Sequence, residues 1–284
     1  MAALIVVLLV TACDPHRIAG TVKIGLVAPF EGAFRSIGYD AIYAARLAIR
    51  EINAAGGIDG WVVELVAYDD RGEVDLAERT AGNLAFDQDV VAVIGHFRPD
   101  TSSAASAIYK NEDVPLLVLG GWEGSAPLTW SLAPSPDALA EAIAALANGL
   151  PAGWLDLSVP AFGPVAGGDE DGTPFVTPYP DTGAIEGVEA WVVDYRSMGP
   201  HVSGPGPLAL PTYEAVYLIA EAIEAALHAG RAPTREAVGA ALGSAQRSGW
   251  LGKISWDAGG YWEAPALYVY RWLDGVPVFV EKVR

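Results

Sequence analysis

The sequence is poor in the residues that build reactive centres and metal sites. Its 284 residues contain one cysteine, Cys13, and four histidines that are scattered along the chain. A single cysteine excludes an internal disulfide and a four-ligand cysteine cluster for zinc. The sequence also lacks the Walker A, G-x-S-x-G, G-x-G-x-x-G and H-E-x-x-H patterns of common enzyme chemistries. We therefore expect a protein that is not an enzyme and that holds no cofactor and no metal.

Basic residues are scarce as well. Lysine and arginine total 17 against 35 aspartates and glutamates, which gives a formal net charge of −18. Such a charge disfavours nucleic acid and anionic lipid surfaces as partners, because both are themselves negative. Apolar residues make up 52% of the chain, so we expect a folded protein with an acidic surface rather than a disordered one.

The amino-terminal apolar run, Leu4–Val10, is too short to span a bilayer, which takes about 20 residues. It is typical of the apolar part of a secretory signal. The V-T-A-C that ends at Cys13 resembles a bacterial lipobox, in which the cysteine is acylated and becomes the mature amino terminus. We therefore expect a signal peptide over residues 1–13, a lipid anchor on Cys13 and a tether over residues 14–21. The alternative is a free thiol in a chain with a misassigned start, because Met1–Ala3 lacks the usual basic residues.

Residues Val22–Asp70 predict a strand, a crossover helix and a second strand, the unit from which parallel sheets are built. The strands are Val22–Ala28 and Trp61–Tyr68, and the helix begins at Gly38. The alternation then continues with helix Val74–Phe86, strand Val90–Ile94, helix Thr101–Lys110 and strand Pro115–Leu119. This pattern predicts an α/β fold with a doubly wound, Rossmann-like parallel sheet.

The second half of the chain predicts fewer regular elements. Residues 149–174 are dense in glycine, proline and aspartate, which indicates a linker. Helices are expected over Asp137–Ala147, Ile185–Met198, Tyr213–Ala229 and after the capping residue Thr234. Strands are expected over Trp250–Trp256, Ala266–Trp272 and Val276–Val280, the last two joined by a turn at Asp274-Gly275.

Three sequence blocks in the first unit also carry a family resemblance. They are the P-F-E-G loop from Pro29, the helix A-R-L-A-I-R-E-I-N-A-A-G-G-I from Ala45, and the Y-D-D that ends at Asp70. Together they resemble the first lobe of type I periplasmic binding proteins, in particular the branched-chain amino acid (Leu/Ile/Val) receptors of ABC importers. The resemblance implies a first lobe over 22–134, a vestigial second lobe with its linker over 135–180, a return to the first lobe over 181–252 and carboxyl-terminal strands over 253–284. Most of the second lobe would then be missing.

The candidate ligand site follows the third and fourth strands, at the carboxyl edge where parallel sheets bind ligands. It comprises Arg98, Thr101, Ser102, Trp122, Glu123 and Ser125. Hydroxyl and N–H groups at a helix amino terminus suit the carboxylate of a zwitterionic ligand. Trp122 and Glu123 would offer a π face and a carboxylate to its ammonium group. The alternatives are helix capping for one of the hydroxyls, a place over the lobe interface for Trp122, and pairing with Glu31 or Glu123 for Arg98.

Neighbouring polar residues are expected to be structural. We expect the backbone to satisfy His96, which ends the third strand, and we expect Asp69 and Asp70 to hold loops and cap helices. The family's carboxylate-binding serine corresponds to Pro99, which has neither an N–H nor a hydroxyl. The family's ammonium-binding acid and tyrosines would come from the missing part of the second lobe. The resemblance therefore implies an amino acid site that is incomplete in both halves.

As a function, the resemblance implies an extracytoplasmic, lipid-anchored solute-binding protein of an ABC importer for amino acids or related small polar ligands such as amides. Its partners would be the ligand, the permease subunits and, through Cys13, the outer face of the bacterial cytoplasmic membrane, unless it is periplasmic. Two alternatives stay open: a degenerate receptor that has lost ligand binding, and a non-transport interaction or sensor module that can form a homodimer. The module's aromatic anchors would be Trp122, Trp154, Trp191 and Trp250.

Overall fold

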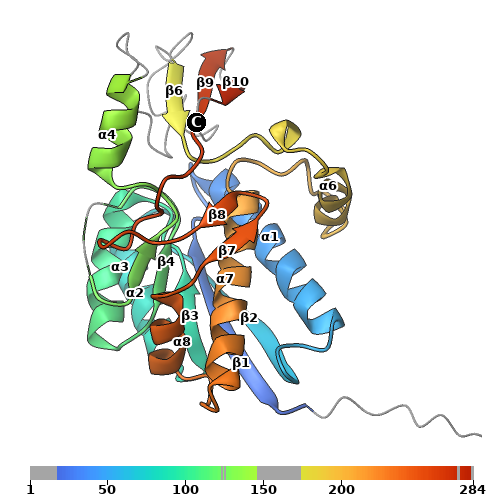
Figure 1. Cartoon of the computed structure of the whole chain (residues 1–284), viewed down its shortest axis with the longest axis vertical. Coiled ribbons are helices and arrows are strands. Elements are labelled where there is room, and N and C mark those ends of the chain that lie inside the picture. The colour runs from blue at the N-terminus through green and yellow to red at the C-terminus, as the bar shows by residue number, and fades with distance from the viewer. Residues whose placement is uncertain (1–17, 123, 125, 146–173, 274–275, 283–284) are drawn as a thin grey trace, which may run out of the picture.

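A five-stranded parallel sheet forms the centre of the molecule. The computed structural model describes residues 18–122, 124, 126–145, 174–273 and 276–282 (Figure 1). The strands are β1 (Gly20–Ala28), β2 (Trp61–Asp69), β3 (Val90–Ile94), β4 (Leu116–Val118) and β5 (Thr129–Ser131). They lie in the order β2-β1-β3-β4-β5, with every neighbouring pair parallel. The predicted doubly wound α/β sheet is confirmed.

Helices cover both faces of this sheet. On one face lie α1 (Arg35–Ala54), α6 (Glu189–Arg196) and α7 (Ala209–His228), and on the other lie α2 (Val74–Phe86) and α3 (Pro99–Asn111). Alternate side chains of β1 serve the two cores, since Ile24 and Leu26 join the α1–α7 core and Val27 joins the α2–α3 core. This is why the strand reads as an unbroken apolar run.

Several helices begin earlier than their apolar periodicity predicts, among them α1, which starts at Arg35 instead of Gly38. Helix α3 starts at Pro99 because proline, with its fixed φ and no N–H, suits the first helical position. Helix α7 starts at Ala209 and includes Pro211 in its first turn, where the missing N–H removes no helical hydrogen bond. Elements without such residues, such as α2 and β3, have the predicted bounds.

The amino edge of the sheet is held by one buried arginine. Arg235 opens α8 (Arg235–Leu242), whose predicted cap is confirmed because the Thr234 hydroxyl accepts from the Ala237 N–H. The Arg235 guanidinium donates to main-chain carbonyls of Leu84, Ala85, Asp87, Val90 and Glu112. These carbonyls include the last groups of α2, so the cation lies at the negative end of a helix dipole. Burial lowers the pKa of this guanidinium, which stays charged.

A second, smaller sheet lies above the carboxyl edge of the first, near α4 (Pro136–Ala145) (Figure 1). Its antiparallel strands are β6 (Pro174–Thr177), β9 (Tyr268–Leu273) and β10 (Val276–Lys282), in the order β10-β9-β6. Their shared core is aromatic and contains Phe175, Tyr268, Tyr270 and Trp272. The predicted linker and the turn at Asp274-Gly275 lie outside the described residues.

One strand prediction is wrong. Trp250–Trp256 is not a single strand, because Trp250 and Leu251 form the turn of a hairpin between β7 (Arg247–Gly249) and β8 (Gly252–Ile254). The hairpin packs on α7 through Glu214, a fully buried carboxylate that accepts from the Arg247 guanidinium and from the Trp250 N–H. A charge on the partner helix thus determines where the chain turns.

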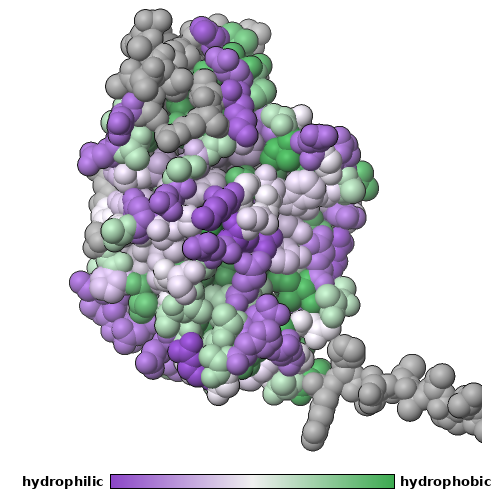
Figure 2. Space-filling model, viewed as in Figure 1, coloured by the Kyte–Doolittle hydropathy of each residue, from purple (hydrophilic) through white to green (hydrophobic). Residues whose placement is uncertain are grey.

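The surface agrees with an acidic, folded chain. Polar and apolar side chains are interspersed over the face shown in Figure 2, without one large apolar patch. Scattered apolar side chains of this kind are normal on a protein surface.

Candidate functional site

The carboxyl edge of the parallel sheet has the geometry of a binding site. Strands β1 and β3 are neighbours, but the helices that follow them, α1 and α3, pack on opposite faces. The chain therefore diverges at this point, and doubly wound folds bind ligands between the loops that follow two such strands, a place that we call the crevice. Four loops meet along this edge, at residues 29–34, 70–73, 95–98 and 119–124.

The loop after β2 is held by Asp69. One of its carboxylate oxygens accepts from the N–H groups of Phe30, at 2.8 Å, and Arg71, at 2.9 Å. The other lies 3.7 Å from the Arg71 guanidinium. Because Phe30 follows β1, this carboxylate ties the first two loops of the edge together. The expected loop hydrogen bonds of Asp69 are confirmed.

Asp70, His96 and Tyr109 form a buried polar chain beside it. Asp70 accepts from the Gly72 N–H through one oxygen and lies 2.7 Å from His96 Nδ1 through the other. Because an ionised carboxylate only accepts, Nδ1 carries the proton, and Nε2 is left to accept from the Tyr109 hydroxyl at 3.4 Å. Burial, together with the nearby Asp70 carboxylate, raises the pKa of Tyr109, so this phenol stays protonated.

This arrangement corrects one expectation. The His96 ring is satisfied by two side chains and not by the backbone. Its partners come from the end of β2 and from the third turn of α3, so the sequence around His96 contains no sign of them. The three residues have no exposed surface to offer a ligand, and their hydrogen bonds connect the ends of β2 and β3 with α3 beneath the carboxyl edge of the sheet.

Arg98 occupies the rim of the crevice. Its guanidinium carbon lies 4.0 Å from the centre of the Phe34 ring, and its Nε lies 3.3 Å from the Asp100 carboxylate. Its side chain is 18% exposed. One carboxylate partner is thus Asp100 in the first turn of α3, and Glu123, one of the two partners expected from the sequence, lies outside the described residues. A cation stacked on an aromatic ring at the mouth of the crevice could attract an anionic ligand group.

The hydroxyls of Thr101 and Ser102 point into the protein. Thr101 donates to the Arg98 carbonyl at 3.2 Å and Ser102 donates to the His96 carbonyl at 2.9 Å, and both residues are fully buried. Neither caps α3, whose capping residue Arg98 makes no side-chain cap, so the predicted capping role is wrong. Their hydroxyl protons are used, which leaves the oxygens able only to accept further bonds.

Trp122 packs inside the molecule instead of over an open crevice. It is 3% exposed, and its ring centre lies 5.9 Å from that of Tyr261. It shares a core cluster with Ala105 and Tyr109 of α3, so Trp122 and the first turns of α3 meet on the same side of the sheet. Glu123 and Ser125 lie outside the described residues.

Two residues of this edge were missed by sequence reasoning. The Tyr179 hydroxyl accepts from the Gly120 N–H at 3.1 Å, and the Tyr261 hydroxyl accepts from the Gly124 N–H at 3.1 Å. Burial raises the pKa of Tyr179 well above its ordinary value. Both tyrosines are distant in sequence from the loop they contact, and no local pattern marks them.

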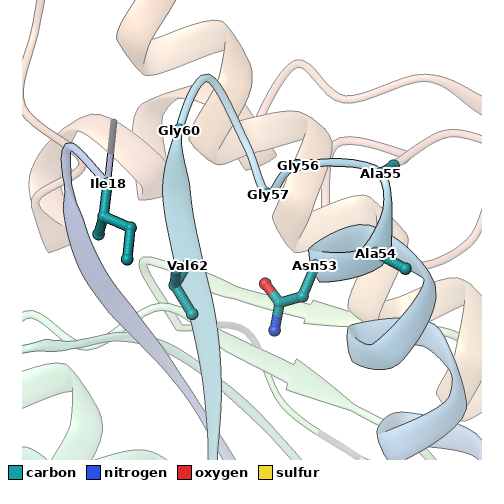
Figure 3. Close-up of a pocket in the computed structure, with 8 residues that line it drawn as sticks. All are labelled: Ile18, Asn53, Ala54, Ala55, Gly56, Gly57, Gly60 and Val62. Carbon is teal, nitrogen blue, oxygen red and sulfur yellow. The ribbon is translucent and has the colours of Figure 1, made fainter. Parts of the chain in front are cut away.

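The cavities lined by small residues lie at the other edge. One of about 500 Å³ is formed where α1 ends and β2 begins, and its lining includes Ile18, Asn53, Gly60 and Val62 (Figure 3). The Asn53 amide is already bonded in both directions to the Val63 backbone. The described residues of the lining include no charged side chain, so they offer little to a polar ligand.

Within the described part of the chain, no three His, Cys, Asp or Glu side chains are grouped so that they could hold a metal ion. Among the same residues, no helix is both long enough and apolar enough to cross a membrane.

Comparison with known proteins shows which protein families and structures this chain resembles. Residues 21–153 match the family model described as periplasmic binding protein. An amino acid binding protein of Pseudomonas aeruginosa is 34% identical over 111 residues, which are 39% of this chain and 29% of that protein. The Leu/Ile/Val-binding protein of Escherichia coli K12 is 30% identical over 100 residues, 35% of this chain and 27% of that protein. The matched part therefore spans less than a third of either relative.

Solved structures extend the likeness to nearly the whole fold. The branched-chain amino acid transporter substrate-binding protein LivJ of Streptococcus pneumoniae, in complex with isoleucine, superposes with a TM-score of 0.69 at 19% identity and covers 93% of this chain and 100% of its own. The leucine-binding protein LivK of Thermotoga maritima gives a TM-score of 0.74 at 16% identity, with 93% and 99% covered. At these identities the likeness shows the fold.

Proposed function

We propose that the chain is an extracytoplasmic solute-binding protein of an ABC importer, because residues 21–153 match the family model described as periplasmic binding protein. Proteins of this family bind ligands and are not enzymes, in line with the absence of catalytic motifs. The observation that carries the proposal is the β1–β3 switch point of the parallel sheet, at which the family match and the ligand-binding edge of the fold coincide.

The proposed ligand is an amino acid or a related small polar molecule such as an amide. Its contacts would come from Arg98, Thr101, Ser102, Trp122, Glu123 and Ser125. Arg98 is the member with a positive charge at the rim, and it would attract the ligand's anionic group in competition with Asp100. Thr101 and Ser102 are fully buried and donate their hydroxyl protons to main-chain carbonyls, which speaks against a direct contact of these two residues with the ligand.

A thermal shift screen across amino acids and short amides tests this proposal. A ligand present at a hundred times its Kd stabilises the folded state by about 2.7 kcal/mol, a rise of several degrees in Tm for a chain of this size. Arg98→Met serves as the site variant, and Arg231→Met, an exposed arginine on the opposite edge, serves as its control. If no compound in the panel raises the Tm of the wild type, the proposed amino acid or amide ligand is wrong.

We also propose that Cys13 carries a lipid anchor that holds the protein at the outer face of the cytoplasmic membrane, where permease subunits would read the bound state. Support comes from the V-T-A-C sequence and the short apolar run before it. Expression in a bacterial host with labelled palmitate, compared between wild type and Cys13→Ser, tests the anchor. Label on both proteins or on neither would refute it.

We retain the division of the chain as a proposal, with a first lobe over 22–134, a vestigial second lobe and linker over 135–180, a first-lobe return over 181–252 and carboxyl-terminal strands over 253–284. The pairing of β9 with β6 joins those last strands to the small second sheet.

A non-transport interaction module is the second candidate. It is favoured by the internal hydrogen bonds along the crevice, because polar groups that already have partners within the protein are less available to a small ligand. Two of its four proposed anchors do not serve it, however, because Trp122 and Trp191 are 3% and 5% exposed. Trp250 is partly exposed, and Trp154 lies outside the described residues. Size-exclusion chromatography with light scattering tests the homodimer that this alternative allows.

A further inference from the structure

The loop that follows β4 is held at its beginning by a tyrosine from another part of the chain. Gly120 comes two residues after β4, and its N–H donates to the Tyr179 hydroxyl at 3.1 Å. Tyr179 is 1% exposed and comes two residues after β6, in the segment that leaves the small second sheet. A buried N–H without a partner is costly, so this phenol stabilises the loop in one position.

A second tyrosine holds the other end of the same loop. The Tyr261 hydroxyl accepts from the Gly124 N–H at 3.1 Å and lies 2.7 Å from the Gly124 carbonyl, to which it can donate its proton. It also lies 3.3 Å from the Trp122 carbonyl, and its ring packs on the Trp122 indole. One hydroxyl group thus contacts the main chain of both Trp122 and Gly124.

Both tyrosines are themselves fixed by the second sheet or by the edge of the first. The Tyr179 carbonyl accepts from the hydroxyl of Tyr270, which lies on β9 and stacks on Phe175 of β6. Tyr261 bridges to Ser131 of β5, and the following Trp262 N–H donates to carbonyls at the end of that strand. The two segments that connect the sheets, one after β6 and one before β9, therefore both contact this loop, through Tyr179 at Gly120 and through Tyr261 at Gly124.

We propose that Tyr179 and Tyr261 are positioning residues that fix the two ends of the 120–124 loop and couple the small second sheet to the candidate ligand site. This coupling rests on the proposed function in one respect, because that function makes the loop part of the ligand site. A ligand that contacts Gly120, Trp122 or Gly124 would meet main-chain groups that already have hydrogen-bond partners. Positioning of this kind preserves affinity because the ligand does not bear the cost of ordering the loop.

The test uses Tyr179→Phe and Tyr261→Phe in the full chain, since each change removes a hydroxyl and keeps the ring. Tyr268→Phe is the matched control, because Tyr268 is a buried tyrosine of β9 whose hydroxyl makes no hydrogen bond within the described residues. Hydrogen exchange followed by mass spectrometry reports on peptides that cover residues 116–126. Loss of one hydrogen bond of ordinary strength predicts exchange about five-fold faster in these peptides, with the urea midpoint close to that of the wild type.

The outcomes separate this inference from the proposed function. Unchanged exchange at residues 116–126 in both variants overturns the inference, as does faster exchange throughout the chain with a lower urea midpoint, because the tyrosines would then serve only overall stability. The binding arm uses L-isoleucine in calorimetry, and about three- to five-fold weaker binding is expected in the two variants but not in Tyr268→Phe. If the wild type binds isoleucine and the variants bind it equally well, the coupling to the site is refuted. If exchange rises locally and the wild type binds no ligand, the positioning role stands and the proposed function fails.

Discussion

Replacing Asp70 tests how strongly the buried chain under the crevice holds the edge of the sheet. Asp70 and His96 have no exposed surface, and the carboxylate receives both His96 Nδ1–H and the Gly72 N–H. Asp70→Asn keeps the shape but offers one oxygen and one NH₂ group, so one of the two donors faces another donor. Asp70→Ala removes both acceptors. We expect a loss of about 2 kcal/mol in the free energy of unfolding for Asn, and about 3–5 kcal/mol for Ala, which breaks a buried polar pair.

Urea unfolding followed by tryptophan fluorescence measures these losses, because Trp122 lies in the core next to this chain. With a slope of about 3 kcal/mol per molar urea, Asp70→Asn should lower the midpoint by about 0.7 M. Asp89→Asn is the control, since that carboxylate is 67% exposed and pairs with Lys23 at the surface; its loss should stay within about 1 kcal/mol. If Asp70→Asn shifts the midpoint no more than Asp89→Asn, the buried chain does not fasten the edge.

Three further predictions concern the rest of the scaffold. Burial raises the pKa of Asp40, whose carboxylate accepts from the Gly206 N–H, from 3.8 to about 7. The folded state therefore binds this proton more tightly than the unfolded state, and the contribution of Asp40 to stability falls as pH rises from about 4 to 7. Urea midpoints across that range should fall less steeply with pH in Asp40→Asn than in the wild type, and equal slopes would refute the assignment. Arg235→Met should cost about 3–5 kcal/mol in urea unfolding because buried carbonyls lose a charged donor, whereas Arg231→Met should cost less than about 0.5 kcal/mol. Gly38→Ala places a Cβ 2.3 Å from the Pro29 carbonyl oxygen, so α1 must move from the end of β1 at a cost of about 1–3 kcal/mol; an unchanged Tm would show that the loop yields freely.

Local sequence patterns predict the first sheet well. Val90–Ile94 is buried at every position, and Ala77, Ala81 and Leu84 form a buried face of α2 although Val74 and Phe86 are exposed, so each segment carries much of its structure in its own composition. Glycine and charged residues mark the ends of both. These signals are local, and both segments lie within residues 21–153, which match the family model.

Contacts between distant segments could not be predicted in this way. Ser102 and Thr101 are hydroxyl residues at a helix amino terminus, and that pattern alone suggests ligand binding or capping. Their actual acceptors are the His96 and Arg98 carbonyls, which depend on how α3 leaves β3. The bond from Gly120 to Tyr179 spans 59 residues and arises from the placement of the second sheet, which no periodicity describes.

The internal hydrogen bonds also determine what a ligand can gain at this edge. The N–H groups of Gly120 and Gly124 already have tyrosine oxygens as acceptors. A ligand carboxylate that took either N–H would replace a buried phenol oxygen, so one hydrogen bond would be exchanged for another with little net gain. Binding free energy at this edge must therefore come from charge and from apolar area. In the proposed site this charge would come from Arg98, and a ligand's anionic group would compete with the Asp100 carboxylate for its guanidinium.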